Sequence, residues 1–309
     1  MSLFVYRIIH ILKYKKCILG GKIMEEDIQL TTELLDEIVK EAYKRGVEDA
    51  QGRKERQKEG YKKRLGQEEL KKHFKHNYGS FYFDFYIRIE ELLNDSLLSR
   101  TLYLCSYLDF DNNLVIKKGK PINKDNLHII LRISKKQSDR TRDDLIKKDI
   151  LIMNQDESFS INKKYFRKGD IMREESVETV RVFDNAIREL YESCTPREHK
   201  KLALLYKLIP YINNNWNIVC KNINEENREL IEPYELKEIA KVLGVTNVTR
   251  FKNDLLKLTV NGQPVVMIQL VLNKSRILIN PKVYYKGTRL DEVKNIEDDI
   301  QQILNKEQK

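Results

Sequence analysis

The sequence closes two of its segments in the same way, with Ile161-Asn162-Lys163-Lys164-Tyr165-Phe166-Arg167-Lys168-Gly169 and with Ile279-Asn280-Pro281-Lys282-Val283-Tyr284-Tyr285-Lys286-Gly287. Ile, Asn, Lys, an aromatic residue, Lys and Gly recur in register. Because similar residues precede each stretch in the same order, the sequence predicts one fold used twice. A period of about 110 residues is too long for a solenoid repeat and indicates a duplicated domain.

Each copy is predicted to run helix, short strand, helix, helix, hairpin. The first copy has an apolar helix at 102–108, an Asn-rich turn at 111–113, a strand at 114–116, a helix opened by Pro121, a polar helix ending at 144–147 and a hairpin at 150–161. The second has these features at 202–212, 213–215, 216–219, Pro233, 254–257 and 265–279. Apolar runs separated by Asn, Asp and Ser are hairpin signals.

This element order is typical of a winged helix-turn-helix, in which the second of the paired helices enters the major groove of DNA and the hairpin is the wing. The second copy fits better. Leu236, Ile239 and Leu243 have helical spacing, and Gly244 is able to adopt positive φ at the turn. In the first copy, the positions of Ala240 and Gly244 hold His128 and Arg132, so its helix-turn-helix is less regular.

We therefore predict a mainly α fold with small β-wings (α+β), built from two tandem winged helix-turn-helix domains. The expected parts are a basic helical arm at 24–80, winged helix 1 at 81–173, a connecting helix at 174–194, winged helix 2 at 195–289 and a C-terminal helix at 290–309. The connecting helix is inferred from the stripe Val177, Val180, Phe183, Ile187 and Leu190. The stripe Val293, Ile296, Ile300 and Ile303 predicts that the last helix packs on its own domain, with a coiled-coil seam as the alternative.

The predicted arm and the residues that precede it carry separate signals. Residues 20–24, Gly-Gly-Lys-Ile-Met, can be encoded by a ribosome-binding sequence followed by a start codon, so we expect translation to start at Met24 and residues 1–23 to be untranslated. Residues 53–76 hold ten Lys or Arg and four Asp or Glu. The arm is expected to be partly helical and to become ordered on DNA; a solvated charged linker is the equally weighted alternative.

The composition is 41% hydrophobic and 34% charged, with a net charge of +10 over 309 residues, which favours a polyanionic partner. Cys17, Cys105, Cys194 and Cys220 are scattered, so reduced thiols and a cytoplasmic location are expected rather than a zinc site or disulfides. No apolar run reaches the roughly 20 residues of a membrane span, and no membrane partner is expected.

The sequence contains no convincing active site, and we predict a protein that is not an enzyme and uses no cofactor or metal. It has no glycine-rich phosphate loop. His73 and His76 lack partners at ligand spacing and are expected at the surface, while Asp109 and Asp111 are typical of a turn. A rolling-circle nicking enzyme needs a His-hydrophobic-His metal motif, and none of the five histidines supplies one.

The predicted DNA-facing residues lie on the two reading helices and on the second wing. Those of the first helix mainly suit phosphates, although Arg140 or Arg142 could also pair with guanine. Asn and Arg of the second helix suit adenine and guanine. The first set is Lys135, Lys136, Gln137, Ser138, Arg140, Thr141 and Arg142. The second set is Thr246, Asn247, Thr249, Arg250, Lys252 and Asn253, with Lys274 and Arg276 on the wing. The alternative for all of them is an ordinary solvated helix face.

The Tyr-aliphatic turn, the Pro-led helix and the Asn-aromatic-Gly ending resemble the winged-helix replication proteins of plasmids and phages from low-GC Gram-positive bacteria, with residues 85–170 similar to the RepL type. The resemblance implies binding to origin repeats in double-stranded DNA, host replication proteins as partners and action without catalysis. A transcriptional regulator of a mobile element and a protein-binding winged-helix adaptor are the alternatives. A homodimer is compatible with each.

Overall fold

A computed structural model describes residues 25–78, 82–86, 89–116, 119–168, 179–271, 274–287 and 289–307. The chain divides into two compact units, Met1–Arg64 and Leu65–Lys309. The segment expected to precede the translation start, residues 1–23, lies outside the described residues. No helix in the described ranges is long and apolar enough to cross a membrane.

The predicted basic arm is one continuous helix, α2, from Glu25 to Asn77. Gly46, Gly52, Gly60 and Gly66 all lie inside it, although glycine weakens a helix interior. The C-terminal part of the helix is not a solvated arm. Residues from Leu65 onward belong to the second unit, and Leu70, Phe74 and Tyr78 are buried there.

The first copy begins with α3 (Asp95–Cys105), which Asn94 caps by accepting a hydrogen bond from the backbone N–H of Leu97 at 3.0 Å. The short α4 (Leu127–Ile130) and the longer α5 (Lys135–Lys147) follow, and strands β2 (Leu151–Met153) and β3 (Phe159–Ile161) form an antiparallel hairpin. Residues 113–115 form bridges beside them rather than a full strand.

The second copy contains α7 (His199–Leu208), the 3-10 turn η3 (Ile209–Tyr211), α8 (Leu236–Val242) and α9 (Val248–Leu256), followed by the hairpin of β8 (Val266–Val271) and β9 (Lys274–Ile279). Two short elements have no equivalent in the described part of the first copy. They are the 3-10 turn η4 (Arg228–Leu230) and the small hairpin β6–β7 (Thr259–Val260, Gln263–Pro264).

Each copy contains a buried asparagine whose side chain makes the same two hydrogen bonds within that copy. Asn112 has φ 71°, and its Nδ2 donates to the carbonyls of Ile161 at 3.0 Å and Phe166 at 2.6 Å. Asn217 has φ 52°, and its Nδ2 donates to the carbonyls of Ile279 at 3.1 Å and Tyr284 at 2.7 Å. These bonds reach the two stretches that match in sequence, so the match reflects a repeated structure.

The bonds also correct the alignment of the Asn-rich turns. The sequence pairs 111–113 with 213–215, but in the structure Asn112 corresponds to Asn217. Asp109 corresponds to Asn213, since each side chain accepts hydrogen bonds from backbone N–H groups of its own turn. The turn of the second copy is longer, which shifts the register.

The predicted connecting helix at 174–194 is wrong over residues 179–183, and residues 174–178 lie outside the described part of the chain. Residues Thr179–Phe183 form strand β5, and the helix α6 starts only at Asp184 and ends at Glu192. Strand β5 belongs to an antiparallel sheet of order β4-β1-β5, with β1 at Tyr82–Tyr86 and β4 at Phe166–Lys168. A 3-10 turn, η1 (Ile89–Glu91), follows β1.

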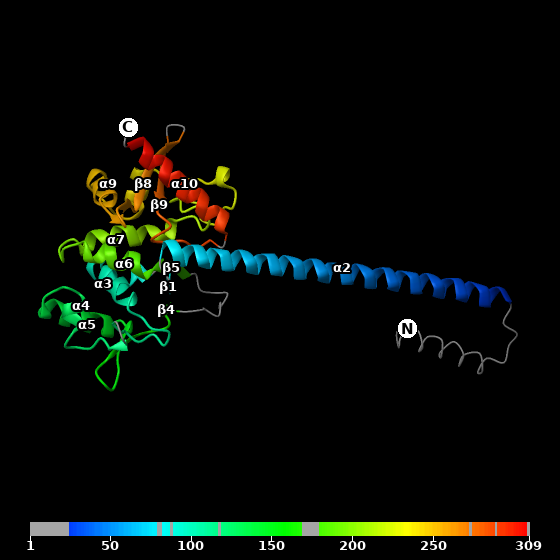
Figure 1. The fold of residues 1–309 in the computed structure, drawn as a ribbon. Coiled ribbons are helices and arrows are strands. Elements are labelled where there is room, and N and C mark those ends of the chain that lie inside the picture. Colours follow the sequence, from blue (N-terminus) through cyan, green and yellow to red (C-terminus); the bar gives the residue numbers. More distant parts are fainter. Residues whose placement is uncertain are drawn as a thin grey trace. The chain divides into compact units, whose positions relative to one another are not determined.

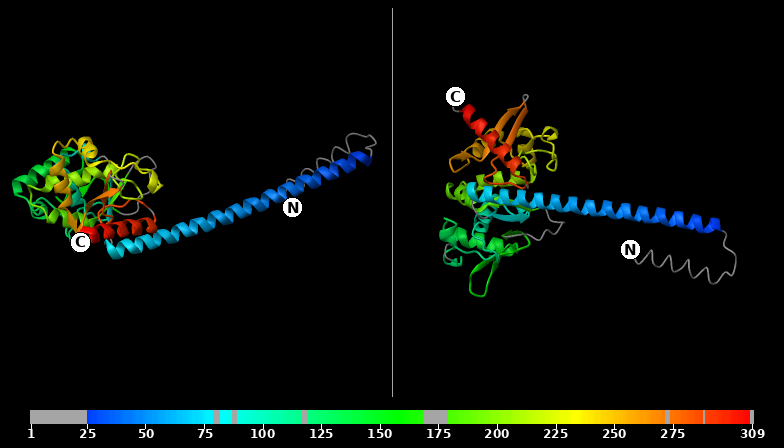
Figure 2. Two further views of the ribbon diagram at one scale, coloured as in Figure 1. Left: turned by 90° about the horizontal axis from the view of Figure 1, so that it is seen from above. Right: turned by 45° about the vertical axis from the view of Figure 1, so that its right-hand side comes forward.

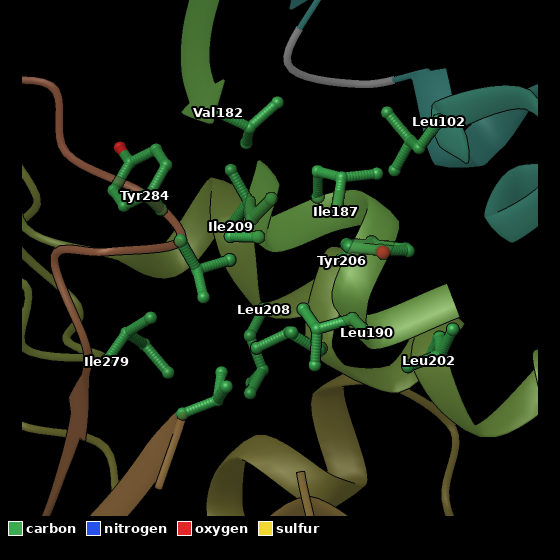
Figure 3. Close-up of a cluster of buried hydrophobic side chains, with 14 of the residues drawn as sticks. Leu102, Val182, Ile187, Leu190, Leu202, Tyr206, Leu208, Ile209, Ile279 and Tyr284 are labelled. Carbon is green, nitrogen blue, oxygen red and sulfur yellow. The ribbon is translucent and has the colours of Figure 1, made fainter. Parts of the chain in front are cut away.

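The two copies share one hydrophobic core within residues 65–309. Helix α3 of the first copy packs on α7 of the second, and α6 packs on both. Figure 1 shows these three helices between α4 and α5 on one side and α9 with β8 and β9 on the other. Leu102, Ile187, Leu190, Leu202 and Tyr206 meet in this core (Figure 3) and are at most 2% exposed. The fold is α+β, mainly helical with small antiparallel sheets.

Polar contacts also join the first copy to the second copy and to the connecting helix α6. Ser99 Oγ donates to the carbonyl of His199 at 2.6 Å, and Tyr191 Oη donates to the carbonyl of Leu131 at 2.9 Å. Arg132, at φ 52°, forms an ion pair with Glu192 at 2.7 Å. The copies are therefore held by directed bonds as well as by apolar packing.

The last helix, α10 (Leu290–Glu307), packs on its own unit, as the apolar stripe predicts. Val293, Ile296, Ile300 and Ile303 are all buried. Figure 2 shows α10 beside the last turns of α2. There Glu297 accepts a hydrogen bond from Tyr78 Oη and lies 3.2 Å from Nε2 of His73, so His73 is not the surface residue that the sequence predicts.

Candidate nucleic-acid interface

Helix α9 is set by a defined turn after α8. A capping box of Glu235 and Glu238 starts α8. Gly244, at φ 68°, ends it, a backbone conformation that glycine adopts at little cost. Asn247 then caps α9, because its Oδ1 accepts a hydrogen bond from the backbone N–H of Arg250 at 2.8 Å. Both ends of the connection between the helices are thus fixed by local chemistry.

The two faces of α9 differ sharply. Phe251 and Leu255 are each 1% exposed and anchor the helix in the core. The residues predicted to contact DNA are on the exposed side: Thr246, Asn247, Thr249, Arg250, Lys252 and Asn253. The side chain of Arg250 is 69% exposed, and its only ion pair among the described residues is a loose one of 3.6 Å to Asp254. Arg250 is therefore available to an outside partner.

Asn247 has a different role from the predicted one. The sequence assigns it to adenine recognition, but its side-chain oxygen is occupied by the cap of α9. A bidentate contact with adenine needs both the oxygen and the amide nitrogen. In this conformation Asn247 positions the helix instead of reading a base.

Helix α5 presents a smaller outward face than the sequence predicts. Lys135, Lys136, Gln137 and Arg140 are exposed. Ser138 and Thr141 are 3% and 2% exposed, and Thr141 Oγ1 accepts a hydrogen bond from Arg100 at 3.0 Å. These two residues were misassigned because a 3-residue spacing puts both on the face that packs inward.

Arg142 was also misassigned as a free DNA-facing cation. It forms ion pairs of 2.8 Å with both Asp139 and Asp143, and its side chain is only 15% exposed. Its charge is balanced within α5. The first copy thus retains three exposed cations of the predicted set, and α9 has the more accessible surface of polar side chains.

The two hairpins differ in the charge that their described residues offer. In the first, Asp156 accepts hydrogen bonds from the backbone and hydroxyl of Ser158, which hold the pKa of its carboxyl below the usual value. In the second, the side chain of Lys274 lies outside the described part of the structure. Arg276 is half-buried: burial, and then the charge of Arg228, lowers its pKa.

The sequence interpretation missed two exposed lysines on α8. Lys237 and Lys241 are four residues apart on one face of the helix that packs directly on α9. Their i, i+4 spacing was a usable signal, but the apolar positions of α8 dominated its interpretation. They add positive charge to the element that precedes the candidate reading helix.

The described residues contain no cluster of three or more His, Cys, Asp or Glu side chains able to hold a metal ion. Comparisons with known protein families, curated proteins and solved structures found no match to this chain.

Proposed function

We propose that the protein is a sequence-specific, double-stranded DNA-binding replication initiator of a plasmid or phage, acting without catalysis on origin repeats in the cytoplasm. In this proposal each copy is a winged helix-turn-helix, with α5 and α9 as its reading helices. Host replication proteins are its further partners.

One observation carries the proposal: α9 exposes Thr249, Arg250, Lys252 and Asn253 on one side while Phe251 and Leu255 fix its other side in the core. A helix entering the major groove needs an accessible face of donors and acceptors and a rigid base. The repeated order of helix, helix and hairpin supports the same function, since it places the second helix of each pair next to a β-hairpin.

The two reading helices divide the work. Lys135, Lys136 and Arg140 of α5 suit phosphate contacts, which hold a protein on DNA without reading its sequence. Arg250 of α9 suits guanine, whose O6 and N7 accept two hydrogen bonds from one guanidinium. Removing Arg250 does not leave Asp254 unpaired, because Lys201 lies 3.6 Å from it.

The test of sequence reading is a competition assay with cognate and scrambled duplexes, the cognate site being selected from random DNA by the wild type. Arg250→Ala should lower the preference for the cognate duplex by roughly 1–3 kcal/mol. Lys135→Ala with Lys136→Ala should weaken binding to both duplexes alike. The reverse pattern would show that α5 reads the sequence and α9 contacts the phosphates.

The initiator role is tested by plasmid replication. The gene from Met24 onward, with its flanking DNA, should support a replication-defective plasmid in a low-GC Gram-positive host, and Arg250→Glu should abolish that support while the purified variant remains folded. If no plasmid is maintained but a reporter promoter is repressed, the protein is a transcriptional regulator. If no duplex is bound, the adaptor alternative replaces both.

A further inference from the structure

The middle of α2 concentrates positive charge on an exposed helix. Residues 53–64 contain seven Lys or Arg and two Glu, and every one of these twelve residues is exposed. The preceding part of the helix is different, because residues 40–49 hold three Lys or Arg and three Asp or Glu. The charge is therefore specific to 53–64 and is not a general property of α2.

The cations of this segment have no acidic partners among the described residues. None of the seven forms an ion pair with a described residue, and Arg53 donates only to the backbone carbonyl of Asp49, at 3.3 Å. About two turns earlier, by contrast, Arg45 pairs with Glu41 at 2.9 Å. Unpaired side chains of this density repel one another, and a polyanion would remove that repulsion.

The arrangement of the charges selects among polyanionic partners. Successive residues of a helix are 100° apart, so Lys54, Lys58 and Lys62 share one face. Arg53, Arg56 and Lys63 point to other sides, and the cations surround the axis. A helix that lies on a lipid surface needs a continuous apolar face, and the only aromatic or aliphatic residue in the segment is Tyr61, which is 61% exposed. A nucleic acid, whose phosphates surround a groove, matches this distribution.

The dimensions agree with a phosphate backbone. Twelve helical residues extend over about 18 Å at 1.5 Å per residue. Over that length a DNA duplex presents on the order of ten phosphates, at one charge per roughly 1.7 Å. With cations on all sides of the helix, about half of the seven face one duplex at a time.

The helix itself gains from such a partner. Gly52 precedes the charged residues and Gly60 lies among them, and a Cβ at either position would have no atom within 4 Å. Each weakens a helix by about 1 kcal/mol relative to alanine. Lys54 and Lys58, and Lys58 and Lys62, are like charges at i, i+4 spacing, which lowers helix stability further.

We propose that residues 53–64 of α2 form a second nucleic-acid contact, which binds the phosphate backbone of DNA without reading its sequence. The contact rests on the proposed function in that the same duplex is read by α9. It supplies affinity, and α9 supplies the choice of site.

The test compares two full-length variants that lose the same charge. The first replaces Lys54, Lys58, Lys62 and Lys63 with Gln, which is a good helix former. The matched control replaces four exposed lysines elsewhere with Gln: Lys40, Lys44, Lys124 and Lys294. For each, the binding constant for cognate and scrambled duplexes is measured between 50 and 200 mM salt, and the helical signal is measured by circular dichroism with and without DNA.

The first variant should lose about two phosphate contacts, so the slope of log K against log salt should become shallower by about 2. Its preference for the cognate duplex should be unchanged, and DNA should induce less additional helix than in the wild type. The control should keep the wild-type slope. Equal slopes for the two variants would overturn the proposal, as would an unchanged slope in both.

Three further outcomes separate the alternatives. If the first variant binds DNA like the wild type but no longer binds vesicles containing anionic phosphatidylserine, the partner is a lipid surface and the proposal is wrong. If the wild type binds no duplex, both the proposed function and the proposed contact of residues 53–64 are wrong. A loss of cognate preference without a change in slope would place the segment in sequence reading and would also contradict the proposal.

Discussion

At the scale of single residues, the pair Asn112 and Asn217 is the most informative feature. Each is a buried asparagine at positive φ whose amide group satisfies two carbonyls from the end of its hairpin segment. Asparagine is one of the few residues that adopt this conformation readily and also donate two hydrogen bonds. Asparagine is thus favoured for two reasons, the positive φ of the backbone and the two hydrogen bonds that the side chain donates.

Replacing Asn217 should therefore have a graded cost. Asn217→Ala should reduce the free energy of unfolding by about 2–4 kcal/mol, because two buried carbonyls lose their donor and alanine is strained at this φ. Asn217→Gly should cost about 1 kcal/mol less, since it relieves only the strain. Urea unfolding measures both, with Asn215→Ala as a control near zero. Equal losses for Ala and Gly would show that φ is unimportant.

A second prediction at this scale concerns His199. It is 1% exposed, stacks on Tyr191 at a centroid distance of 4.0 Å, and its Nδ1 has no partner among the described residues. Burial, and then the charge of Arg100, lowers its pKa to about 4. Because the unfolded chain takes up the proton between its ordinary pKa of about 6.5 and the folded value, stability should fall as the pH falls through that range.

The loss between pH 7 and pH 5 should be about 2 kcal/mol for His199 alone. His199→Phe keeps an aromatic ring and removes the titration, so its unfolding free energy should change less over the same interval. Urea unfolding of both proteins at the two pH values measures the difference. A His199→Phe profile parallel to that of the wild type would assign the acid sensitivity to other groups.

At the scale of elements, the cap of α9 gives a prediction that differs from the sequence interpretation of Asn247. Asn247→Ala should destabilise the protein by about 1 kcal/mol through the lost cap, and Asn247→Asp should restore most of that stability. On DNA, both variants should keep the wild-type preference for the cognate duplex if Asn247 only positions the helix. Thermal unfolding and the competition assay check the two halves of the prediction. A lost preference in the Asp variant would return Asn247 to base reading.

The elements that the sequence predicted well are those with local signals. The positions of α8 and α9 follow from Leu236, Ile239 and Gly244, and the packing of α10 follows from its apolar stripe. Strand β5 was missed because Val180, Phe183 and Ile187 have the spacing of a helix face. Its true partner, β1, is about a hundred residues away, a pairing that no local pattern encodes.

The candidate interface was predictable to a similar extent. Residue type and position identified Arg250 and Lys252, which the structure leaves exposed. The sequence could not distinguish Ser138 and Thr141 from their exposed neighbours, because the inward face of α5 is polar. Ion pairs such as Arg142 with Asp139 and Asp143 likewise depend on side-chain conformations that the order of residues does not fix.

At the scale of the whole molecule, the shared core makes the two copies one cooperative body. Leu102 of the first copy is fully buried against α6 and α7 (Figure 3). Leu102→Ala should lower the free energy of unfolding by about 2–5 kcal/mol. Trp216, the single tryptophan, lies in the second copy, so its fluorescence reports on that half alone.

In denaturant, the Trp216 transition of Leu102→Ala should shift together with the circular dichroism of the whole chain. An exposed substitution in the same copy, Lys124→Ala, is the control and should leave both midpoints unchanged. If Leu102→Ala left the Trp216 midpoint in place, the two copies would unfold independently, and the shared core would contribute little to their coupling.

The paired asparagines have a consequence for how this chain has diverged. Asn112 and its carbonyl acceptor Ile161 are 49 residues apart, whereas Asn217 and Ile279 are 62 apart, and the longer interval accommodates an extra hairpin and an extra turn. Insertions between the two ends are thus tolerated as long as the ends still meet. Descendants of the same ancestor should keep an asparagine followed, after a variable interval, by Ile-Asn and an aromatic residue, while most of the intervening sequence changes beyond recognition.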